Sequence, residues 1–223
     1  MEELFKKLNI SPKNKELYKQ AFIHTSYAYE NNLDYSYETL EFLGDAILEL
    51  AVSDYLYREN KFHEGDMTKL RASYVCENAL YEYATDLEFN KLVMLGKGEL
   101  NTGGNYKKAI LADIFEAFIA AIYLDLGYEK AKQVVLDIII PYVENKEVMF
   151  FSDYKSELQE AVQDVQRELT YELVNESGPA HDKQFEMAVK IDNIVYGTGE
   201  GHTKKEAEQE AAKSALTKLV KDE

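Results

Sequence analysis

Two short segments carry acidic side chains whose spacing could support chemistry. In the first, ETLEFLGDAILEL (Glu38–Leu50), the carboxylates Glu38, Glu41 and Asp45 recur three and four residues apart. This spacing gathers them on one face of a helix, where like charges repel one another unless cations compensate. The segment alone leaves two interpretations open, a solvated acidic face and a cation site.

The second acidic segment is AILADIFEAFIAAIYL. Here Asp113 and Glu116 are the only charged residues between Lys108 and Asp125, and they share one face of an otherwise apolar helix. Burying an ionised carboxylate costs several kcal/mol unless a cation or hydrogen bonds compensate. A structural ion pair with lysine or arginine would meet this cost. The alternative is that both acidic faces meet around a hard divalent cation.

The ligand types indicate which cation would suit such a site. Carboxylates without nearby histidine or cysteine favour Mg²⁺ or Mn²⁺ over zinc or copper. Cys76 is the only cysteine, so neither an intramolecular disulfide nor a cysteine-based zinc cage can form. The Glu-x-x-His pairs of di-iron helical bundles are missing. Magnesium held by carboxylates and waters is typical of phosphoryl chemistry.

Helices must position both segments, and apolar residues three and four apart predict helices over most of residues 1–148. The glycine- and lysine-rich segment Gly96–Lys108 is predicted to be a loop. The predicted helices are Lys15–His24, Glu38–Tyr57, Thr68–Leu87, Lys108–Leu126 and Tyr128–Ile140, the last closed by Pro141.

Two residues of the first acidic segment do not follow its apolar stripe. Gly44 costs up to about 1 kcal/mol relative to alanine in mid-helix, which suggests close approach by another backbone. Phe42 projects away from the stripe, among the acidic side chains. It could contact a partner or a second internal face, and this stretch favours neither.

After about residue 150 the pattern changes to that of a small α+β domain. Thr203 and Glu206 form a predicted capping box at the start of the last helix. The predicted order is a helix over Tyr154–Gln166, strands over Tyr171–Val174, Gln184–Ile191 and Ile194–Gly199, and a helix over Thr203–Val220. We expect the domain boundary within residues 144–152, giving domains 1–148 and 149–223.

Composition restricts the class of protein. The 223 residues carry 41 acidic and 25 basic side chains, a formal charge of −16, with 46% hydrophobic residues. This balance excludes a disordered tail, a collagen-like rod and a disulfide scaffold. Bulk charge does not attract nucleic acid, so polyanion binding would need local basic clusters or a metal. With no signal peptide and no stretch long enough to span a bilayer, we expect a cytoplasmic protein without membrane contact.

Several motifs resemble one family, in the expected order over nearly the whole chain. ETLEFLGDAILEL closely resembles the signature helix of the ribonuclease III family, and ILADIFEAFIAAIYLD its second acidic motif. AFIHTSYAYE resembles a segment near that family's N-terminus. The tail, with DYKSELQEAVQ, GPAHDKQFEMAV and TKKEAEQEAAKSAL, is similar to a double-stranded RNA-binding domain.

The resemblance implies an all-α endonuclease domain followed by an α-β-β-β-α RNA-binding domain. It implies a homodimer formed through the signature helix, with Phe42 inserting into the partner. Asp45 and Glu116 would be catalytic, and Glu38 and Glu64 would contact RNA or the edge of the catalytic valley. The implied ligands of Mg²⁺, for which Mn²⁺ could substitute, are Glu41, Asp45, Asp113 and Glu116.

The resemblance also implies which residues bind RNA. Those on the first tail helix and in the loop between strands would each face a minor groove, and two lysines would bind phosphate where the last helix begins. Taken singly, the lysines suit a solvated helix start and the histidine an ordinary loop. The implied RNA contacts are Ser156, Gln159, Gln163, Gly178, Pro179, His181, Lys204 and Lys205.

The implied activity is magnesium-dependent hydrolysis of double-stranded RNA, leaving 5′-phosphate, 3′-hydroxyl and short 3′ overhangs. Its substrates would be ribosomal RNA precursors and other structured transcripts, including messenger and transfer RNA. Thr39, Ala46 and Ala109 depart from the usual family residues but remove no carboxylate. Three alternatives remain: an RNA-binding regulator without cleavage, a structural dimer module of a ribonucleoprotein, and a helical hydrolase of small phosphates.

Overall fold

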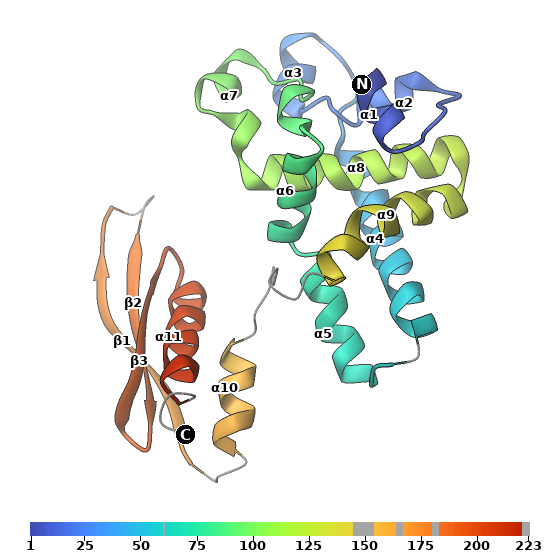
Figure 1. The fold of residues 1–223 in the computed structure, drawn as a ribbon. Helices are drawn as coiled ribbons and strands as arrows, with labels where there is room; N and C mark the ends of the chain where they lie inside the picture. Colours follow the sequence, from blue (N-terminus) through green and yellow to red (C-terminus); the bar gives the residue numbers. More distant parts are fainter. Residues whose placement is uncertain (60, 145–153, 164–166, 180–182, 220–223) are drawn as a thin grey trace. The chain divides into compact units, whose positions relative to one another are not determined.

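The computed structural model describes residues 1–59, 61–144, 154–163, 167–179 and 183–219. The chain divides into two compact units, Met1–Phe151 and Ser152–Glu223 (Figure 1). Each unit has a hydrophobic core of its own. The predicted boundary between residues 148 and 149 lies outside the described residues.

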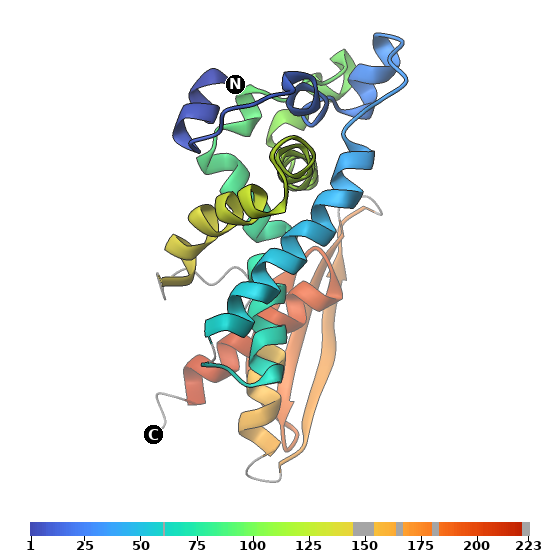
Figure 2. The same cartoon turned by 90° about the vertical axis from the view of Figure 1, so that its right-hand side faces the viewer.

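The first unit is helical, as the sequence predicts, and is built around one buried helix. Every residue of α8 from Ile110 to Ile122 is buried except Asp113 and Glu116. Figure 2 looks nearly along α8 and shows other helices of the unit around it. The α-helices are α1 (Glu2–Lys7), α2 (Lys15–Gln20), α3 (Thr25–Glu30), α4 (Glu38–Glu59), α5 (Glu64–Tyr74), α6 (Glu77–Asp86), α7 (Lys97–Asn101), α8 (Lys108–Leu126) and α9 (Tyr128–Glu144), and the 3₁₀-helices are η1 (Phe89–Lys91) and η2 (Gly104–Tyr106).

A hydrogen-bonded carboxylate at the end of α8 ties the N-terminal segment to this core. The Asp125 carboxylate accepts hydrogen bonds from the main-chain N–H groups of Lys13 (2.9 Å) and Asn14 (2.8 Å). It also accepts one from the hydroxyl of the buried Tyr18, at 2.9 Å. The start of α2 and the residues before it are thereby held against α8.

Three predicted boundaries were wrong in this unit. The segment Thr68–Leu87 is not one helix, because the chain turns at Val75 and Cys76 between α5 and α6. Both helices turn apolar faces to the core, so the apolar spacing continues across the break. Gly96–Lys108 contains α7 and η2 rather than only a loop. Helix α9 continues past Pro141, since a proline in the last turn removes only one hydrogen bond.

The segment before α4 also differs from the prediction. Helix α2 ends at Gln20, and His24 instead caps the separate helix α3. The His24 ring accepts a hydrogen bond from the main-chain N–H of Ser26 at 3.1 Å. Histidine is an uncommon cap, so the sequence carried no strong signal for this boundary.

The second unit has the predicted order of helix, three strands and helix. Its antiparallel sheet has the strand order β1-β2-β3 and carries α11 against β2 and β3 (Figure 1). Asp192 and Asn193 both have positive φ in the tight turn between β2 and β3. The elements are α10 (Tyr154–Gln163), β1 (Leu169–Ser177), β2 (Gln184–Ile191), β3 (Ile194–Gly201) and α11 (Lys204–Leu219).

Two local features fix α11 on this sheet. The predicted capping box is confirmed: the Glu206 N–H donates to Thr203 Oγ1, and Glu206 Oε2 accepts from the Thr203 N–H, both at 3.1 Å. Gly197 and Gly199 let the helix backbone approach β3, since a Cβ atom at Gly199 would lie 2.2 Å from the main-chain nitrogen of Ala211. In the described part of both units, no helix is long and apolar enough to cross a membrane.

Candidate active site

Helices α4 and α8 cross at Gly44, and this crossing builds the candidate site. A Cβ atom at Gly44 would lie only 1.9 Å from the carbonyl oxygen of Glu116. The prediction that another backbone approaches Gly44 is therefore confirmed. The acidic face of α4, with Glu41 and Asp45, meets the side of α8 that carries Asp113 and Glu116, since these charges act on one another.

Burial and the repulsion of neighbouring charges disfavour the charged forms of Glu41, Asp113 and Glu116. Burial, followed by the charges of Asp45, Glu41 and Asp113, raises the pKa of Glu116 to about 8. Burial and then Asp113, Glu38 and Asp45 raise the pKa of Glu41. Burial likewise raises the pKa of Asp113. The cluster therefore favours the uptake of positive charge, as protons or as a cation.

No lysine or arginine in the described part of the chain supplies that charge. The nearby Lys107 and Lys108 bind Glu99 and Asn78 instead, with distances of 2.6 and 2.9 Å from their Nζ atoms. None of the four carboxylates forms an ion pair among the described residues. The structural ion pair considered from the sequence is therefore not formed there.

The carboxylates suit a magnesium site of the open kind. Among the described residues, no set of three or more histidine, cysteine, aspartate or glutamate side chains is arranged to hold a metal ion by itself. Magnesium rarely uses such a cage, because it keeps several waters and binds one or two carboxylates together with substrate phosphates. Glu41, Asp113 and Glu116 are half-buried and Asp45 is exposed, and none has a lysine or arginine partner among the described residues, which fits this mode of binding.

Tyr37 joins this site, and sequence reasoning missed it. The residue precedes α4, and its carbonyl oxygen accepts from the N–H groups of Leu40 (2.8 Å) and Glu41 (2.9 Å). Its hydroxyl donates a hydrogen bond of 2.9 Å to Asp113 Oδ2. Burial, followed by the Asp113 charge, raises the pKa of the Tyr37 phenol. A tyrosine beside an acidic helix gives no sequence signal for a contact with a residue 76 positions away.

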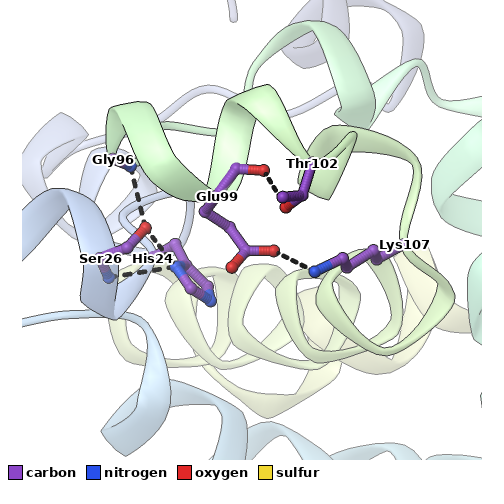
Figure 3. A network of polar contacts seen from close by, with 6 residues as sticks. All are labelled: His24, Ser26, Gly96, Glu99, Thr102 and Lys107. Carbon is purple, nitrogen blue, oxygen red and sulfur yellow. Dashed lines mark hydrogen bonds and ion pairs between the residues drawn. The ribbon is translucent and has the colours of Figure 1, made fainter. Parts of the chain in front are cut away.

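A polar network from α3 and α7 lies beside Tyr37. His24 Nδ1 is 2.7 Å from Ser26 Oγ, which accepts a hydrogen bond of 2.9 Å from the Gly96 N–H. Figure 3 shows this network, with the Glu99 carboxylate between His24 and Lys107. The His24 ring centroid is 5.7 Å from that of Tyr37. His24 thus has a structural role, as the cap of α3 and as a packing neighbour of Tyr37.

The structure brings Glu38, but not Glu64, to the carboxylate cluster. Glu38 begins α4 and its charge acts on Glu41 and Asp113. Glu64 begins α5 and accepts a hydrogen bond of 3.2 Å from Thr68 Oγ1. It lies beside the far end of α4, where it lines a groove with a volume of about 230 Å³. This α4–α5 groove is lined by Ser53, Leu56, Tyr57, Glu64, Met67, Thr68 and Arg71.

Phe42 occupies an exposed position next to the cluster. Its side chain is 84% exposed, although it is a large apolar residue between Glu41 and Leu43. A second internal face, one of the two interpretations left open by the sequence, is therefore not what Phe42 contacts in this chain. An exposed phenylalanine on a rigid helix suits contact with another molecule.

The other predicted RNA contacts lie in the second unit. Gln159 is exposed on α10, Ser156 is half-buried on the same helix, and Gln163 is its last residue. Lys204 and Lys205 are exposed in the first turn of α11, where free N–H groups and the helix dipole favour phosphate.

The loop between β1 and β2 is described only in part. Gly178 and Pro179 follow β1 and are exposed, and Gly178 has a φ of 88°. His181 lies outside the described residues. An ion pair between Lys155 and Glu208 holds the start of α10 against the first turns of α11.

Comparison with known proteins matches both units. A family described as "Ribonuclease-III-like" matches residues 14–143, and "Double-stranded RNA binding motif" matches residues 154–219. "Ribonuclease 3" of Onion yellows phytoplasma is 48% identical over 222 residues, covering 99% of this chain and 92% of the relative. "Ribonuclease 3" of Listeria monocytogenes is 47% identical over 225 residues, covering 98% and 97%.

A solved structure matches the first unit. It is the nuclease domain of ribonuclease III from Campylobacter jejuni, described as showing structural flexibility in a region involved in dimer formation. The TM-score is 0.59 at 38% sequence identity, and the match covers 66% of this chain and 99% of that one.

Proposed function

Since the chain belongs to the ribonuclease III family and is an endoribonuclease with a double-stranded RNA-binding domain, we propose that it cuts double-stranded RNA in a magnesium-dependent reaction. Residues 1–148 would form the catalytic and dimerisation domain, and residues 149–223 the RNA-binding domain. The observation that carries this proposal is the α4–α8 crossing, which groups four carboxylates, three of them half-buried, that have no ion-pair partner among the described residues.

The carboxylates would hold the ion and orient the attacking water. When bound, Mg²⁺ supplies positive charge that activates a water and stabilises the leaving oxygen. The charge of Asp45 acts on Glu116 more strongly than the charges of Glu41 and Asp113 do, so Asp45 and Glu116 are the proposed catalytic pair. The water oxygen bonds to phosphorus while the bond to the 3′ oxygen breaks, which leaves a 5′-phosphate and a 3′-hydroxyl. The residues that would hold the ion, one or two of them directly and the others through its waters, are Glu41, Asp45, Asp113 and Glu116, and Mn²⁺ could replace Mg²⁺.

The second unit would bind the duplex by its shape. Such domains touch 2′-hydroxyls and phosphates across roughly 16 base pairs of A-form RNA. Helix α10 would face one minor groove and the β1–β2 loop the next, while the start of α11 binds phosphate between them. The proposed contacts are Ser156, Gln159, Gln163, Gly178, Pro179, His181, Lys204 and Lys205, with Glu38 and Glu64 at the edge of the catalytic valley.

We propose that the active form is a homodimer in which Phe42 of each copy enters the α4–α5 groove of the other. The side chain is exposed, and Leu56, Tyr57 and Met67 give the groove an apolar lining of suitable size. One two-fold axis would form both contacts, as in a self-complementary dimer. Glu64, on the groove, would then approach the other copy's carboxylate cluster.

Two such sites would cut opposite strands and leave short 3′ overhangs. We place the reaction in the cytoplasm, on duplex regions of ribosomal RNA precursors and other structured transcripts.

Cleavage of long double-stranded RNA by purified full-length protein, in Mg²⁺ or EDTA, tests the proposal. We expect cutting only with metal, with 5′-phosphate ends detected by phosphate-dependent ligation. The E116Q variant should cut at least about 100-fold more slowly, because it loses a proposed ligand, a larger change than the 10–100-fold typical of a ligand's hydrogen-bond partner. The control E129Q removes an exposed carboxylate of α9 and should retain wild-type activity.

Other outcomes would favour the alternatives. Wild-type protein that binds duplex RNA but cuts it with neither Mg²⁺ nor Mn²⁺ would indicate a regulator. Full activity of E41Q and D45N would indicate a structural module and would contradict the proposed site. Activity on small phosphates that survives removal of the second unit would indicate a hydrolase of another substrate class.

A further inference from the structure

We propose that Tyr37 is a positioning residue for the metal site: its main chain fixes Glu41 on α4 while its hydroxyl fixes Asp113 on α8. This inference rests on the proposed function, because it concerns the same carboxylates. Neither contact requires Tyr37 to touch the substrate or the ion. Tyr37 would act by setting the placement of two ligands that come from different helices.

The position of the Tyr37 hydroxyl is determined by contacts of the residue's main chain and ring. The main-chain N–H donates to the carbonyl oxygen of Ile23 at 2.9 Å, and the carbonyl oxygen caps α4. The side chain is only 4% exposed, and its ring packs beside that of His24. The donor reaching Asp113 is therefore held before any ligand binds, which avoids an ordering cost at binding.

His24 itself is held by a second set of contacts. Its ring nitrogen bonds the Ser26 main chain, and Ser26 Oγ accepts from the Gly96 N–H in front of α7 (Figure 3). The Tyr37 ring thus packs against a neighbour that is itself fixed between α3 and α7. The Tyr37 side chain therefore connects this network to Asp113.

Asp113 is the carboxylate whose placement the Tyr37 hydroxyl can affect. Among the described residues it is the only one of the four proposed ligands with a side-chain hydrogen bond. The bond occupies Oδ2 and leaves Oδ1 without a hydrogen-bond partner in that part of the chain. Ligating carboxylates are commonly oriented by a hydrogen bond of this kind, and its loss typically costs 10–100-fold in metal affinity or activity.

The same residue also couples the two helices. The N–H of Glu41 donates to the Tyr37 carbonyl oxygen, so the first turn of α4 and the Asp113 side chain are fixed to one residue. A change in the hydroxyl should therefore alter metal binding without unfolding α4, because the main-chain cap stays intact. That separation makes the proposal testable by a single-atom deletion.

The chain offers a matched control in Tyr18. This tyrosine is also buried, and its hydroxyl also donates a hydrogen bond of 2.9 Å to an aspartate of α8, namely Asp125. Asp125 lies at the other end of the helix and is not among the charges that shift the pKa values of Glu41, Asp113 and Glu116. Y18F therefore removes an equivalent hydrogen bond outside the site.

The experiment measures Mn²⁺ affinity of full-length Y37F, Y18F and wild-type protein by isothermal titration calorimetry, together with their melting temperatures. We expect both variants to melt at similarly lowered temperatures. Y37F should bind Mn²⁺ about 10-fold more weakly than wild type, while Y18F should stay within about twofold. Cleavage by Y37F should need about 10-fold more Mg²⁺ for half-maximal rate and should approach the wild-type rate at saturation. Equal Mn²⁺ affinity in Y37F and Y18F would overturn the proposal.

A double-mutant cycle tests whether Tyr37 acts through Asp113. If it does, Y37F/D113N should bind Mn²⁺ no more weakly than D113N alone, because the acceptor is already altered. A further loss of the full single-mutant factor would contradict the mechanism. In wild-type protein labelled at tyrosine Cζ, Mg²⁺ should shift the Tyr37 resonance but not that of Tyr18, a test that does not depend on how well Y37F folds.

The two proposals fail in distinguishable ways. A wild-type protein that binds no Mn²⁺ and cuts no RNA would overturn both the proposed function and the role of Tyr37. A wild-type protein that binds Mn²⁺ and cuts duplex RNA, with Y37F indistinguishable from Y18F, would overturn the role of Tyr37 alone.

Discussion

Glu116 has the most strongly perturbed of the carboxylate pKa values in the described part of the chain. Burial raises this pKa first, and the neighbouring charges of Asp45, Glu41 and Asp113 raise it further, to about 8. Without a metal, the side chain therefore holds a proton at neutral pH. A divalent cation would replace that proton, because a ligand must be deprotonated before it binds.

The raised pKa predicts how stability changes with pH. A carboxyl whose folded pKa lies above its ordinary value of 4.5 favours folding while it is protonated, and this contribution is lost as pH rises through about 8. In EDTA, the melting temperature of wild type should therefore fall more between about pH 5 and pH 9 than that of E116Q. Mg²⁺ should reduce this difference. Thermal melts at fixed ionic strength measure it, and identical pH slopes would contradict it.

At the level of elements, the crossing of α4 and α8 depends on the missing side chain of Gly44. In G44A the new Cβ atom would meet the Glu116 carbonyl oxygen at 1.9 Å, so the helices must separate. We expect a loss of about 1–3 kcal/mol in the free energy of unfolding, as for overpacked cores. Mn²⁺ affinity should fall too, because the separation moves Asp45 from Glu116. Chemical denaturation and calorimetry measure the two effects.

Gly65 provides the control for this substitution. It is also helical, in α5, but a Cβ atom there would meet nothing within 4 Å. G65A should leave Mn²⁺ affinity unchanged and should not lower stability, since alanine is the better helix former by up to about 1 kcal/mol. A G44A variant as stable as G65A would show that the helices do not meet as described.

Elements with a strong apolar period could be predicted from the sequence, and those determined by packing could not. The bounds predicted for α8 match, because its long apolar run is bounded by Lys108 and Gly127. The turn at Val75 and Cys76 and the short helix α7 depend on contacts between distant segments. For example, the Lys97 N–H in α7 bonds the Glu30 carboxylate, 67 residues away.

In the candidate site too, some features could be predicted from the sequence and others depend on packing. Helical spacing placed Glu41 with Asp45, and Asp113 with Glu116, on single faces, but spacing within one helix cannot give the crossing between two. The close approach was signalled only by Gly44, a costly residue in mid-helix. Tyr37 carried no comparable signal, because its hydroxyl bond depends on the α4–α8 arrangement itself.

At the scale of the whole molecule, the acidic net charge must be compatible with RNA binding and with the proposed homodimer. The chain carries a net charge of −16, so nonspecific attraction to RNA is weak and binding must depend on placed groups. The described parts of the two units have separate cores, which allows duplex binding and cleavage to be assigned to different units. A homodimer would contain two copies of the cleaving unit and two of the RNA-binding unit.

Substitution of Phe42 tests this assembly. F42A should weaken dimerisation at least about 10-fold, because a buried aromatic anchor typically contributes 2 kcal/mol or more. Its melting temperature at dilute concentration should change little, since the side chain is 84% exposed in the single chain. Analytical ultracentrifugation measures the association. The control Y29A removes an aromatic side chain that is 86% exposed on α3 and should leave the dimer intact. A dimer equally stable in F42A would contradict the proposed contact.

The hydrogen-bonded carboxylate at the end of α8 does more than hold the N-terminal segment. Asp125 accepts three hydrogen bonds from Lys13, Asn14 and Tyr18, so the protein itself replaces the hydration of that charge. Asp113 accepts a single one, and Glu116 accepts none from the described side chains. The carboxylates of α8 thus differ in how many hydrogen bonds the protein itself donates to them. In a protein without recognisable motifs, the number of hydrogen-bond donors around each buried carboxylate would help to separate structural carboxylates from those that bind a metal or react.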